Sequence, residues 1–400
     1  MLSVRPEPAA RGAEVAYGTI DDGAAFERLR GEWDDLVRAM RRPSPYLLHA
    51  WLETWWRHFG SGRRLCVHTA RVDGKLVAAL PLCVEERGIV RTLQFIGADR
   101  STLADLLVSD GAPASVAPSL VERAARSGQH VADLFGLPGD SLLARSAGSR
   151  DLRFVARLEA PVLDLDGGWD AVYTEKTTSK RRNLHQRRRR QLAALGTLEC
   201  SVARTEPELM SALEHAFALH ARRWHGRPDT SGFVGARGSA FEEAALRALA
   251  ANGLPRIVLL SLDGRPLAFS YYFIFEQRMY MHRLAFDPAY AAYSPGLVNV
   301  LDALSSASEE GVAKVEFLGG AERFKRELSD RFEPVYEAIG LASGPVGILA
   351  RDARLASIRL RLRLKRSPSV NWLHYRGAAP ARRALARVRR TRHAVGRARA

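Results

Sequence analysis

The chain has 400 residues, more than a single hydrophobic core usually supports, so we expect two domains. Hydrophobic residues make up 46% of the chain and aromatic residues 8%, a composition that excludes disorder over the whole length. The formal net charge is +16, but the last fifty residues alone contain sixteen Lys or Arg and one acid, Asp352. The positive charge therefore belongs to a basic, Arg-rich tail, predicted over residues 346–400, and the preceding body is nearly neutral.

The cysteines and the known short motifs narrow the class of protein further. Cys66, Cys83 and Cys200 lie far apart, which fits three buried thiols in a reducing compartment better than a disulfide framework or a metal site. No apolar leader and no run of about 18 apolar residues is present. HExxH, GxSxG and Walker A motifs are also absent from the sequence. We therefore expect a cytoplasmic protein that binds no metal.

Two distant segments follow the same pattern, in which an Asp-Gly pair joins two alternating stretches. The turns are Asp73-Gly74 and Asp263-Gly264, and the flanking strands are predicted over residues 65–72, 75–82, 257–262 and 265–272. Asp-Gly suits the positive φ angles of a tight type I′ turn, so both segments are predicted β-hairpins. A helix is predicted before each hairpin, over residues 45–59 and 240–251. A further strand is predicted after each hairpin, over residues 89–96 and 278–286.

We interpret this repeat as a duplication. It predicts an α/β fold with mixed (α+β) sheets, built as two tandem domains over residues 15–165 and 166–345. Residues 178–192 contain no proline or glycine and begin with a Thr-Ser pair, which predicts a basic helix that opens the second domain. In the tail, apolar and basic residues alternate strictly over 358–365, a period that argues against an amphipathic helix there.

The sequence Ser294-Pro295-Gly296 predicts the start of an apolar helix after the strand 278–286. Ser294 is a suitable N-cap, and proline at the first helical position sacrifices no hydrogen bond. Gly296 allows a ligand to approach the backbone, and the free N–H groups up to Leu297 form a potential anion site. The alternative is a well-capped helix without a ligand.

The segment 217–325 resembles the acetyltransferase domain of the CelD-type cellulose-biosynthesis proteins, which are relatives of the FemAB aminoacyltransferases within the GNAT superfamily. The matching residues are Leu219-His220, Arg223-Trp224, 262–264, Ala268, 286–290, 294–296, Gly311, 316–320 and Phe324-Lys325. The N-terminal half resembles the same proteins through Glu32-Trp33, residues 51–55 and Ala104-Asp105.

The resemblance implies tandem duplicated GNAT-like domains. Acetyl-CoA or another acyl-CoA would bind as co-substrate between the strand that ends near residue 286 and the strand 312–318. Its pyrophosphate would lie at the helix start formed by Ser294, Gly296 and Leu297. Two features depart from the family pattern: the glycine-rich pyrophosphate loop is absent, and Glu316 stands where similar sequences often have Asp.

Acyl transfer to an amine needs a general base near the cleft. The candidates are Glu316 on the second strand and His282, which is predicted on the same face of its strand as Tyr280. Their alternatives are a salt-bridged strand residue and a hydrogen-bonded core histidine. Lys325, Arg181 and Tyr280 are the predicted substrate-binding residues. The alternative for both Lys325 and the basic run around Arg181 is a solvated helix surface.

The resemblance implies an acyl-CoA-dependent N-acyltransferase that acts on the amine of a small-molecule or saccharide-like acceptor, in exopolysaccharide or cell-envelope biosynthesis. Two alternatives stay open. One is a non-catalytic GNAT-fold assembly protein whose basic tail contacts an anionic membrane surface or nucleic acid. The other is a FemAB-like transferase that uses aminoacyl-tRNA, for which the Arg-rich run 181–190 is suited. The sequence names neither the acceptor nor the oligomeric state.

Overall fold

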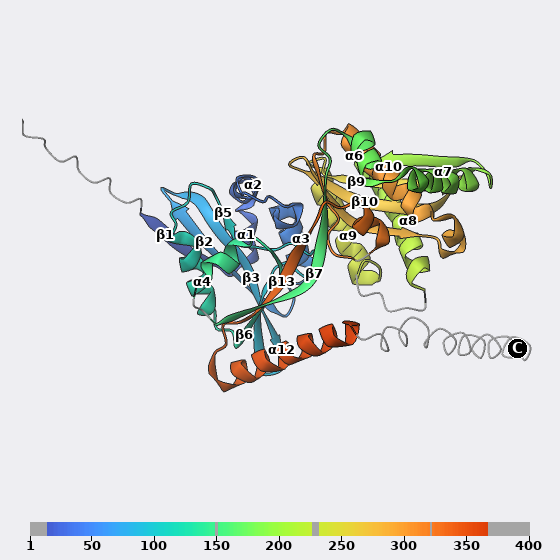
Figure 1. Cartoon of the computed structure of the whole chain (residues 1–400). Helices are drawn as coiled ribbons and strands as arrows, with labels where there is room; N and C mark the ends of the chain where they lie inside the picture. The colour runs from blue at the N-terminus through green and yellow to red at the C-terminus, as the bar shows by residue number, and fades with distance from the viewer. Residues whose placement is uncertain (1–13, 149–150, 226–231, 321, 367–400) are drawn as a thin grey trace, which may run out of the picture.

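The computed structural model describes residues 14–148, 151–225, 232–320 and 322–366 (Figure 1). The first half contains the elements β1 (Val15–Ile20), α1 (Gly23–Glu27), α2 (Arg30–Arg38), η1 (Pro45–Leu47), α3 (His49–Phe59), β2 (Arg63–Val72), β3 (Lys75–Arg87), β4 (Val90–Phe95), β5 (Leu107–Val108), α4 (Val116–Ala125), β6 (Val131–Pro138), α5 (Leu142–Ser146) and β7 (Leu152–Asp164).

The second half contains α6 (Trp169–Lys176), α7 (Ser179–Ala193), β8 (Leu198–Ala203), α8 (Glu206–Trp224), α9 (Ala236–Ala250), β9 (Pro255–Leu262), β10 (Arg265–Phe275), β11 (Arg278–Phe286), η2 (Pro288–Tyr293), α10 (Pro295–Glu309), β12 (Lys314–Glu316), α11 (Arg323–Leu328), β13 (Arg331–Gly340) and α12 (Gly344–Arg366). The basic helix predicted over 178–192 is α7, and Thr178 Oγ1 caps it by accepting from Arg181 N at 3.3 Å.

The strands form one mixed sheet in the order β1-β2-β3-β4-β6-β13-β7-β12-β11-β10-β9-β8, with β5 pairing β3. The two predicted hairpins, β2–β3 and β9–β10, occupy equivalent places in this order. Each is followed by an antiparallel strand, β4 or β11, which pairs in turn with a parallel strand, β6 or β12. Asp73, Gly74, Asp263 and Gly264 all have positive φ angles, as a type I′ turn requires. The predicted duplication and the α/β fold class are confirmed.

The two halves exchange their last strands. β7, the last strand of the first half, pairs with β12 of the second half, whereas β13 pairs with β6 of the first half. β7 and β13 also pair with each other along nearly their whole length, from Val162–Arg331 to Leu152–Gly340. Because of this exchange, neither 15–165 nor 166–345 contains every strand of its own half-sheet. The domain boundary near residue 165, which was drawn from the sequence, stays a prediction.

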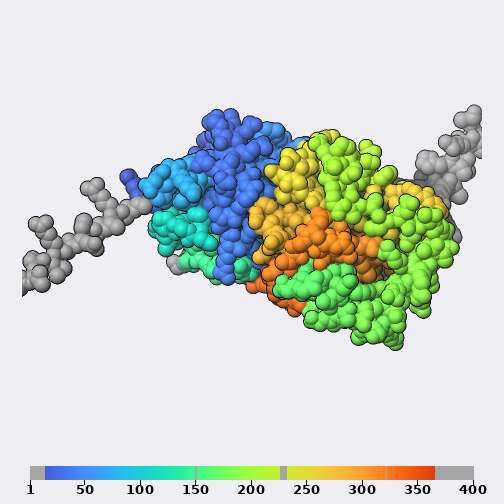
Figure 2. Space-filling model, turned by 90° about the horizontal axis from the view of Figure 1, so that it is seen from above, coloured from blue at the N-terminus to red at the C-terminus, as the bar shows by residue number. Residues whose placement is uncertain are grey.

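Helices from the two halves also pack on each other. α3 lies against α9, where the rings of Trp51 and Phe241 are 5.0 Å apart in an edge-to-face arrangement. In Figure 2, the early residues in blue lie directly against the yellow and orange residues of the second half. The core cluster at this junction contains residues of both halves, so the halves share a hydrophobic core in addition to the sheet.

Two sequence predictions need correction. The stretch 358–365 lies within the helix α12, although its alternation was expected to argue against one. Leu355 and Ile358 are buried against Val131 and Ile339, because positions three and four apart share a helix face whatever residues lie between them. The body therefore extends past residue 346, and residues 367–400 of the predicted tail lie outside the described residues. Cys200 is exposed, whereas it was expected to be buried.

No helix among the described residues is long and apolar enough to cross a membrane. Over the same residues, no group of three or more His, Cys, Asp or Glu side chains is arranged to hold a metal ion.

The strand exchange predicts different effects for two truncations. A chain that ends at residue 330 lacks β13, so β6 and β7 each lose a partner strand, and it should not fold to a protease-resistant monomer. A chain that ends at residue 343 keeps β13 but loses the burial of Leu355 and Ile358. It should fold with a free energy of unfolding lower by roughly 3–6 kcal/mol. Limited proteolysis and urea unfolding measure both effects. Cooperative, full-length-like unfolding of the shorter chain would show that β13 is dispensable.

Candidate active site

β11 and β12 separate after a short paired segment, and a cavity is lined by the part of β11 that continues beyond it. The two strands pair only from Arg278–Lys314 to Tyr280–Glu316, whereas β11 continues to Phe286. A cavity of about 490 Å³, which we call the splay cavity, lies beside this unpaired end of β11. Its walls come from the end of β11, the start of α10, the helices α7 and α11, and the last residues of α8.

Four predicted site residues line the splay cavity: Arg181, Ser294, Gly296 and Leu297. Arg181 Nη2 forms an ion pair with Glu327 at 2.9 Å, and Arg188, Arg223 and Arg323 add three more guanidinium groups to the walls. Two carboxylates, Glu322 and Glu327, also line the cavity, and Glu327 pairs with Arg323 as well. The arginines, which we call the cationic rim, outnumber these acids. With the apolar stretch at Leu284–Phe286, which we call the apolar floor, they suit a ligand with an apolar part and phosphate groups.

The start of α10 differs from the expected geometry. Ser294 occupies the N-cap position, but its φ of 56° is left-handed and its side chain makes no cap hydrogen bond. Pro295 has no N–H, and the N–H groups of Leu297 and Val298 both donate to the Ser294 carbonyl, at 3.0 and 3.3 Å. Gly296 N–H is thus the one remaining donor of the helix start, and the arginine rim is the larger source of positive charge.

A second cavity, of about 370 Å³, lies between the two halves of the molecule and is called the inter-half cavity. Tyr46, residues 98–102 and Phe135 line it from the first half. His282 and Lys325, two predicted site residues, line it from the second half. The two cavities share three wall residues, Trp224, Leu284 and Glu322. The arrangement thus places two compartments side by side, with the end of β11 along both.

His282 on β11 is held by side chains from two other elements. Its Nε2 is 3.0 Å from Glu242 Oε2 on α9, and its Nδ1 is 3.1 Å from the Tyr46 hydroxyl on η1. Burial, together with Arg283, lowers the pKa of His282 to about 4 although Glu242 opposes this shift, so the imidazole is neutral at pH 7. Burial alone would raise the pKa of Glu242, but His282 and the nearby arginines outweigh it and lower this pKa.

These pKa directions define the tautomer of His282. An ionised Glu242 can only accept a hydrogen bond, so Nε2 carries the ring proton and donates to Glu242. Nδ1 then has a lone pair and accepts from the Tyr46 hydroxyl. Burial strongly raises the pKa of Tyr46, which keeps this hydroxyl protonated. The trio Tyr46–His282–Glu242 is thus an oriented chain of hydrogen bonds that begins at the wall of the inter-half cavity.

Lys325 is buried at the wall of the same cavity, unlike a solvated helix lysine. Its Nζ donates to the carbonyls of Phe317 and Gly319, both at 3.0 Å, and lies 3.2 Å from Glu322 Oε2. Burial lowers the pKa of Lys325, although Glu322 opposes this shift. The ammonium group is therefore fixed next to a carboxylate that borders both cavities.

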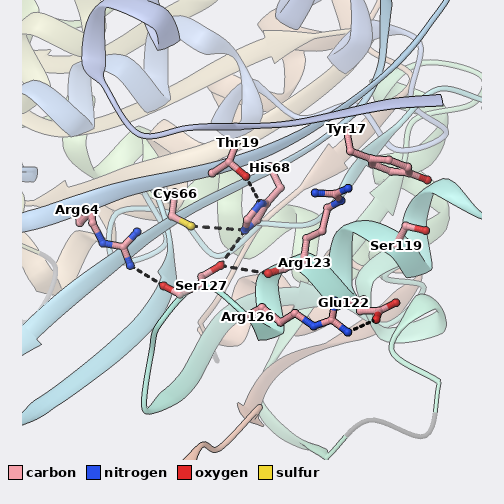
Figure 3. A pocket seen from close by; sticks show the side chains of 10 residues that line it. All are labelled: Tyr17, Thr19, Arg64, Cys66, His68, Ser119, Glu122, Arg123, Arg126 and Ser127. Atoms are coloured by element: carbon pink, nitrogen blue, oxygen red, sulfur yellow. Dashed lines mark hydrogen bonds and ion pairs between the residues drawn. The ribbon is translucent and has the colours of Figure 1, made fainter.

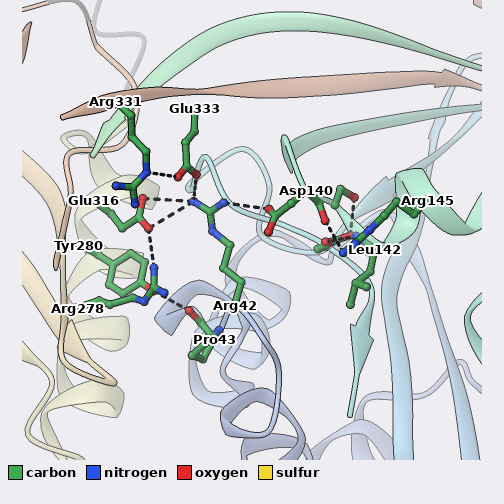
Figure 4. A network of polar contacts seen from close by, with 12 residues as sticks. Arg42, Pro43, Asp140, Leu142, Arg145, Arg278, Tyr280, Glu316, Arg331 and Glu333 are labelled. Atoms are coloured by element: carbon green, nitrogen blue, oxygen red, sulfur yellow. Dashed lines mark hydrogen bonds and ion pairs between the residues drawn. The ribbon is translucent and has the colours of Figure 1, made fainter. Parts of the chain in front are cut away.

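Glu316 and Tyr280, the other two predicted site residues, line neither cavity. Figure 4 shows Glu316 between two arginines, with Arg42 at 3.4 Å and Arg278 at 3.1 Å. Arg42 also reaches Glu333 at 2.6 Å and Asp140 at 3.1 Å. The Tyr280 hydroxyl donates to the Pro43 carbonyl at 2.6 Å. This geometry agrees with the alternative interpretation of Glu316 as a salt-bridged strand residue.

Sequence reasoning missed Tyr46, Glu242 and Glu322. A signal for Glu242 exists: it belongs to the helical face that also carries Ala245, Leu246 and Leu249, all buried. A carboxylate in such an apolar stripe needs a partner in the core. Tyr46 offers no comparable signal, because its partner His282 is 236 positions away in the chain.

The first half contains a separate cavity of about 540 Å³ between β1, β2 and α4 (Figure 3). Its walls include Arg64, Arg123 and His68, and His68 is bonded to Thr19 at 3.0 Å and Ser127 at 2.8 Å. Burial, with Arg123 and Arg64, lowers the pKa of His68 to about 4. This cavity contains no predicted site residue and shares no lining residue with the two cavities around β11.

Comparison with known proteins identifies the second half. Residues 179–326 match the family model described as acetyltransferase (GNAT) domain. No curated protein matches the chain.

Several solved structures share the fold over most of both chains. The C-terminal domain of a candidate lysylphosphatidylglycerol synthetase from Agrobacterium fabrum has 14% identity and a TM-score of 0.52, covering 84% of this chain and 97% of that one. FemX has 12% identity and a TM-score of 0.52, covering 77% and 95%. A protein of unknown function from Bacteroides thetaiotaomicron has 14% identity and a TM-score of 0.50, covering 82% and 99%. At such identities the likeness concerns the fold alone.

The matched segment begins at α7 and ends within α11, so it contains the splay of β11 and β12 and the start of α10. Residues 179–326 therefore match a GNAT acetyltransferase domain within a tandem GNAT-like fold, which supports an acyltransferase.

Proposed function

We propose that the chain transfers an acyl group from acyl-CoA to the amine of a small or saccharide-like acceptor. The donor binds in the splay cavity and the acceptor in the inter-half cavity. The observation that carries this proposal is the wall that both cavities share, formed by Trp224, Leu284 and Glu322. A reacting carbonyl at this wall is accessible from both sides, which brings donor and acceptor together without free diffusion.

The donor side combines a narrow apolar floor with the cationic rim. The acyl chain and pantetheine would lie along Leu284–Phe286, where β11 has no partner strand on the side of β12. Backbone N–H groups at such an edge can stabilise the developing oxyanion. The pyrophosphate would lie near Gly296 N–H and the guanidinium groups of Arg181 and Arg188. These arginines supply the positive charge that the absent glycine-rich loop would otherwise provide.

On the acceptor side, Tyr46 and His282 move the proton. The Tyr46 hydroxyl takes a proton from the attacking amine while it passes its own to His282 Nδ1, and Glu242 stabilises the imidazolium that forms. The C–N bond forms and the C–S bond of the thioester breaks. The proton held on His282 Nδ1 then returns through the Tyr46 hydroxyl to the departing thiolate, which restores the neutral imidazole. Glu242 acts through His282 and is a positioning residue. The side chains of Tyr46 and His282 are both buried at the wall of the inter-half cavity, and the Tyr46 hydroxyl bonded to Nδ1 is the group through which the relay reaches His282.

A second donor class shares the same phosphate chemistry. The arginine-rich helix α7 borders the splay cavity, which favours aminoacyl-tRNA as the alternative donor. The resemblance to the CelD-type proteins supports acyl-CoA and a saccharide-like acceptor in polysaccharide biosynthesis. Acetyl-CoA should raise the melting temperature of the chain if it binds the native state.

Replacing Gly296 with valine should weaken acyl-CoA binding by about tenfold or more, as isothermal titration calorimetry would measure. A Cβ at this position would lie 2.8 Å from Cδ1 of Phe286 and push the ring into the splay cavity. The matched control is Gly31→Val, because no atom lies within 4 Å of a Cβ added there. The double variant Gly296→Val/Phe286→Ala should recover part of the affinity. Wild-type affinity of Gly296→Val would contradict the donor site.

The Glu242→Gln variant should lower kcat by about 100-fold and change KM by only a few-fold, because the amide no longer fixes the tautomer of His282 or stabilises its charged form. The neighbouring Glu243, which is partly exposed on the same helix, gives the matched control Glu243→Gln. Single-turnover kinetics on variants of verified melting temperature would separate the chemical step from a folding defect.

The pH profile provides an independent readout for the same relay. With a pKa of about 4, His282 is neutral from about pH 5 upward. A plot of kcat against pH for the wild type should therefore show no inflection near 6.5, the ordinary pKa of histidine. If an inflection near 6.5 is present and disappears in His282→Gln, the buried relay is wrong.

The Glu316→Gln variant should reduce the free energy of unfolding by roughly 3 kcal/mol, because Arg42 and Arg278 lose a buried anionic partner. Turnover per folded molecule should stay near the wild-type value. Urea unfolding and active-site-normalised kinetics measure the two quantities. The control Glu333→Gln changes a more exposed carboxylate bonded to the same Arg42 and should cost less stability. A loss of turnover at unchanged stability would return the general-base role to Glu316.

A further inference from the structure

The helix α12 has two apolar faces, of which only one is covered by the protein. Leu355 and Ile358 on the inner face are buried against β6 and β13. On the outer face, Leu349 is 73% exposed, Leu360 58% and Leu364 43%, and Ile348 nearby is 48% exposed. Half of the large hydrophobic side chains that are exposed among the described residues lie on this one helix.

The exposed residues form a continuous stripe. Leu349, Ala353, Ala356, Leu360 and Leu364 follow each other at spacings of three and four, which places them on one side of an α-helix. This side is opposite the buried residues. Figure 1 shows α12 as the outermost element at the lower edge of the drawing, where it crosses below β6.

Arginines flank the exposed stripe and lack acidic partners. Arg351 and Arg354, near the inner face, form ion pairs with Asp151, Asp133 and Glu337. By contrast, Arg359, Arg361 and Arg363 are exposed and form no ion pair with any residue in the described parts of the chain. Residues 367–400, which follow in the sequence, add nine arginines and no acid.

We propose that the outer face of α12 lies on the surface of an anionic lipid bilayer, with its leucines at the depth of the acyl chains and Arg359, Arg361 and Arg363 at the phosphate groups. A helix with an apolar stripe, a low overall hydrophobicity and flanking arginines is typical of interfacial membrane binding. The helix α12 contributes no residue to the walls of the two cavities around β11, and the proposal does not depend on the proposed acyl transfer.

Two other occupants fit the surface less well. A second copy of the chain would cover the leucines, but it would bring the unpaired arginines of two helices together. Nucleic acid would pair with the arginines, but it would leave the leucine stripe in water. A bilayer that contains anionic lipids satisfies both the apolar stripe and its charged borders.

Vesicle flotation with the full-length chain tests the proposal. Vesicles of three parts phosphatidylcholine and one part phosphatidylglycerol should retain the wild type, whereas pure phosphatidylcholine should retain much less. The double variant Leu349→Gln/Leu360→Gln should bind at least about tenfold less, and its residual binding should be lost at about 0.5 M salt, because only screened charge attraction remains. The triple variant Arg359→Gln/Arg361→Gln/Arg363→Gln should lose the preference for the anionic vesicles.

The matched control is Leu195→Gln, which changes another exposed leucine, 45% accessible, just after α7. It should float like the wild type. All substituted side chains are exposed, so melting temperatures should stay unchanged and binding losses would not reflect unfolding. Wild-type-like flotation of the double leucine variant would refute the proposal. The proposal would also be refuted if the wild type did not bind anionic vesicles. It would likewise be refuted if the wild type were a dimer and the double leucine variant a monomer.

Discussion

The pairing of β7 with β13 is the constraint on which the rest of the molecule depends. Each strand belongs by sequence to one half and by hydrogen bonding to the sheet of the other half. The exchange joins two half-sheets into one and sets the two halves at a defined position. The helices α3 and α9 then meet across the junction, and η1 comes to lie beside β11. Because Tyr46 and His282 are on these two elements, their contact at 3.1 Å is a product of the strand exchange.

The duplicated halves share a topology but differ in the length of one strand. β11 continues six residues past its last pairing with β12, whereas β4 continues only two residues past its last pairing with β6. A longer unpaired end leaves a wider gap at the edge of the sheet. This difference explains why the splay cavity lies in the second half, and why the cavity of the first half lies elsewhere, between β1, β2 and α4.

The sequence predicted those parts of the structure that depend on neighbouring residues. The Asp-Gly turns, the capped start of α7, and the place of Gly296 at a helix start are local, since turn and cap preferences act over a few residues. The same local reasoning identified four residues of the splay cavity. It was wrong for α12, because strict alternation over a few residues also occurs on a helix that buries only one of its faces. The strand exchange has no local signature at all.

Glu316 and Glu242 show why the choice of a base could not be made from sequence. Both are buried carboxylates in the second half, and burial alone costs free energy for each. Their partners decide what each can do. Both oxygens of Glu316 are engaged by guanidinium groups, those of Arg42 and Arg278, which fits a structural ion pair. His282 can change its charge, so Glu242, which is bonded to it, can stabilise a transient imidazolium. Arg42 lies 274 residues from Glu316 and Glu242 lies 40 from His282, and only the folded chain reveals which carboxylate faces a titratable partner.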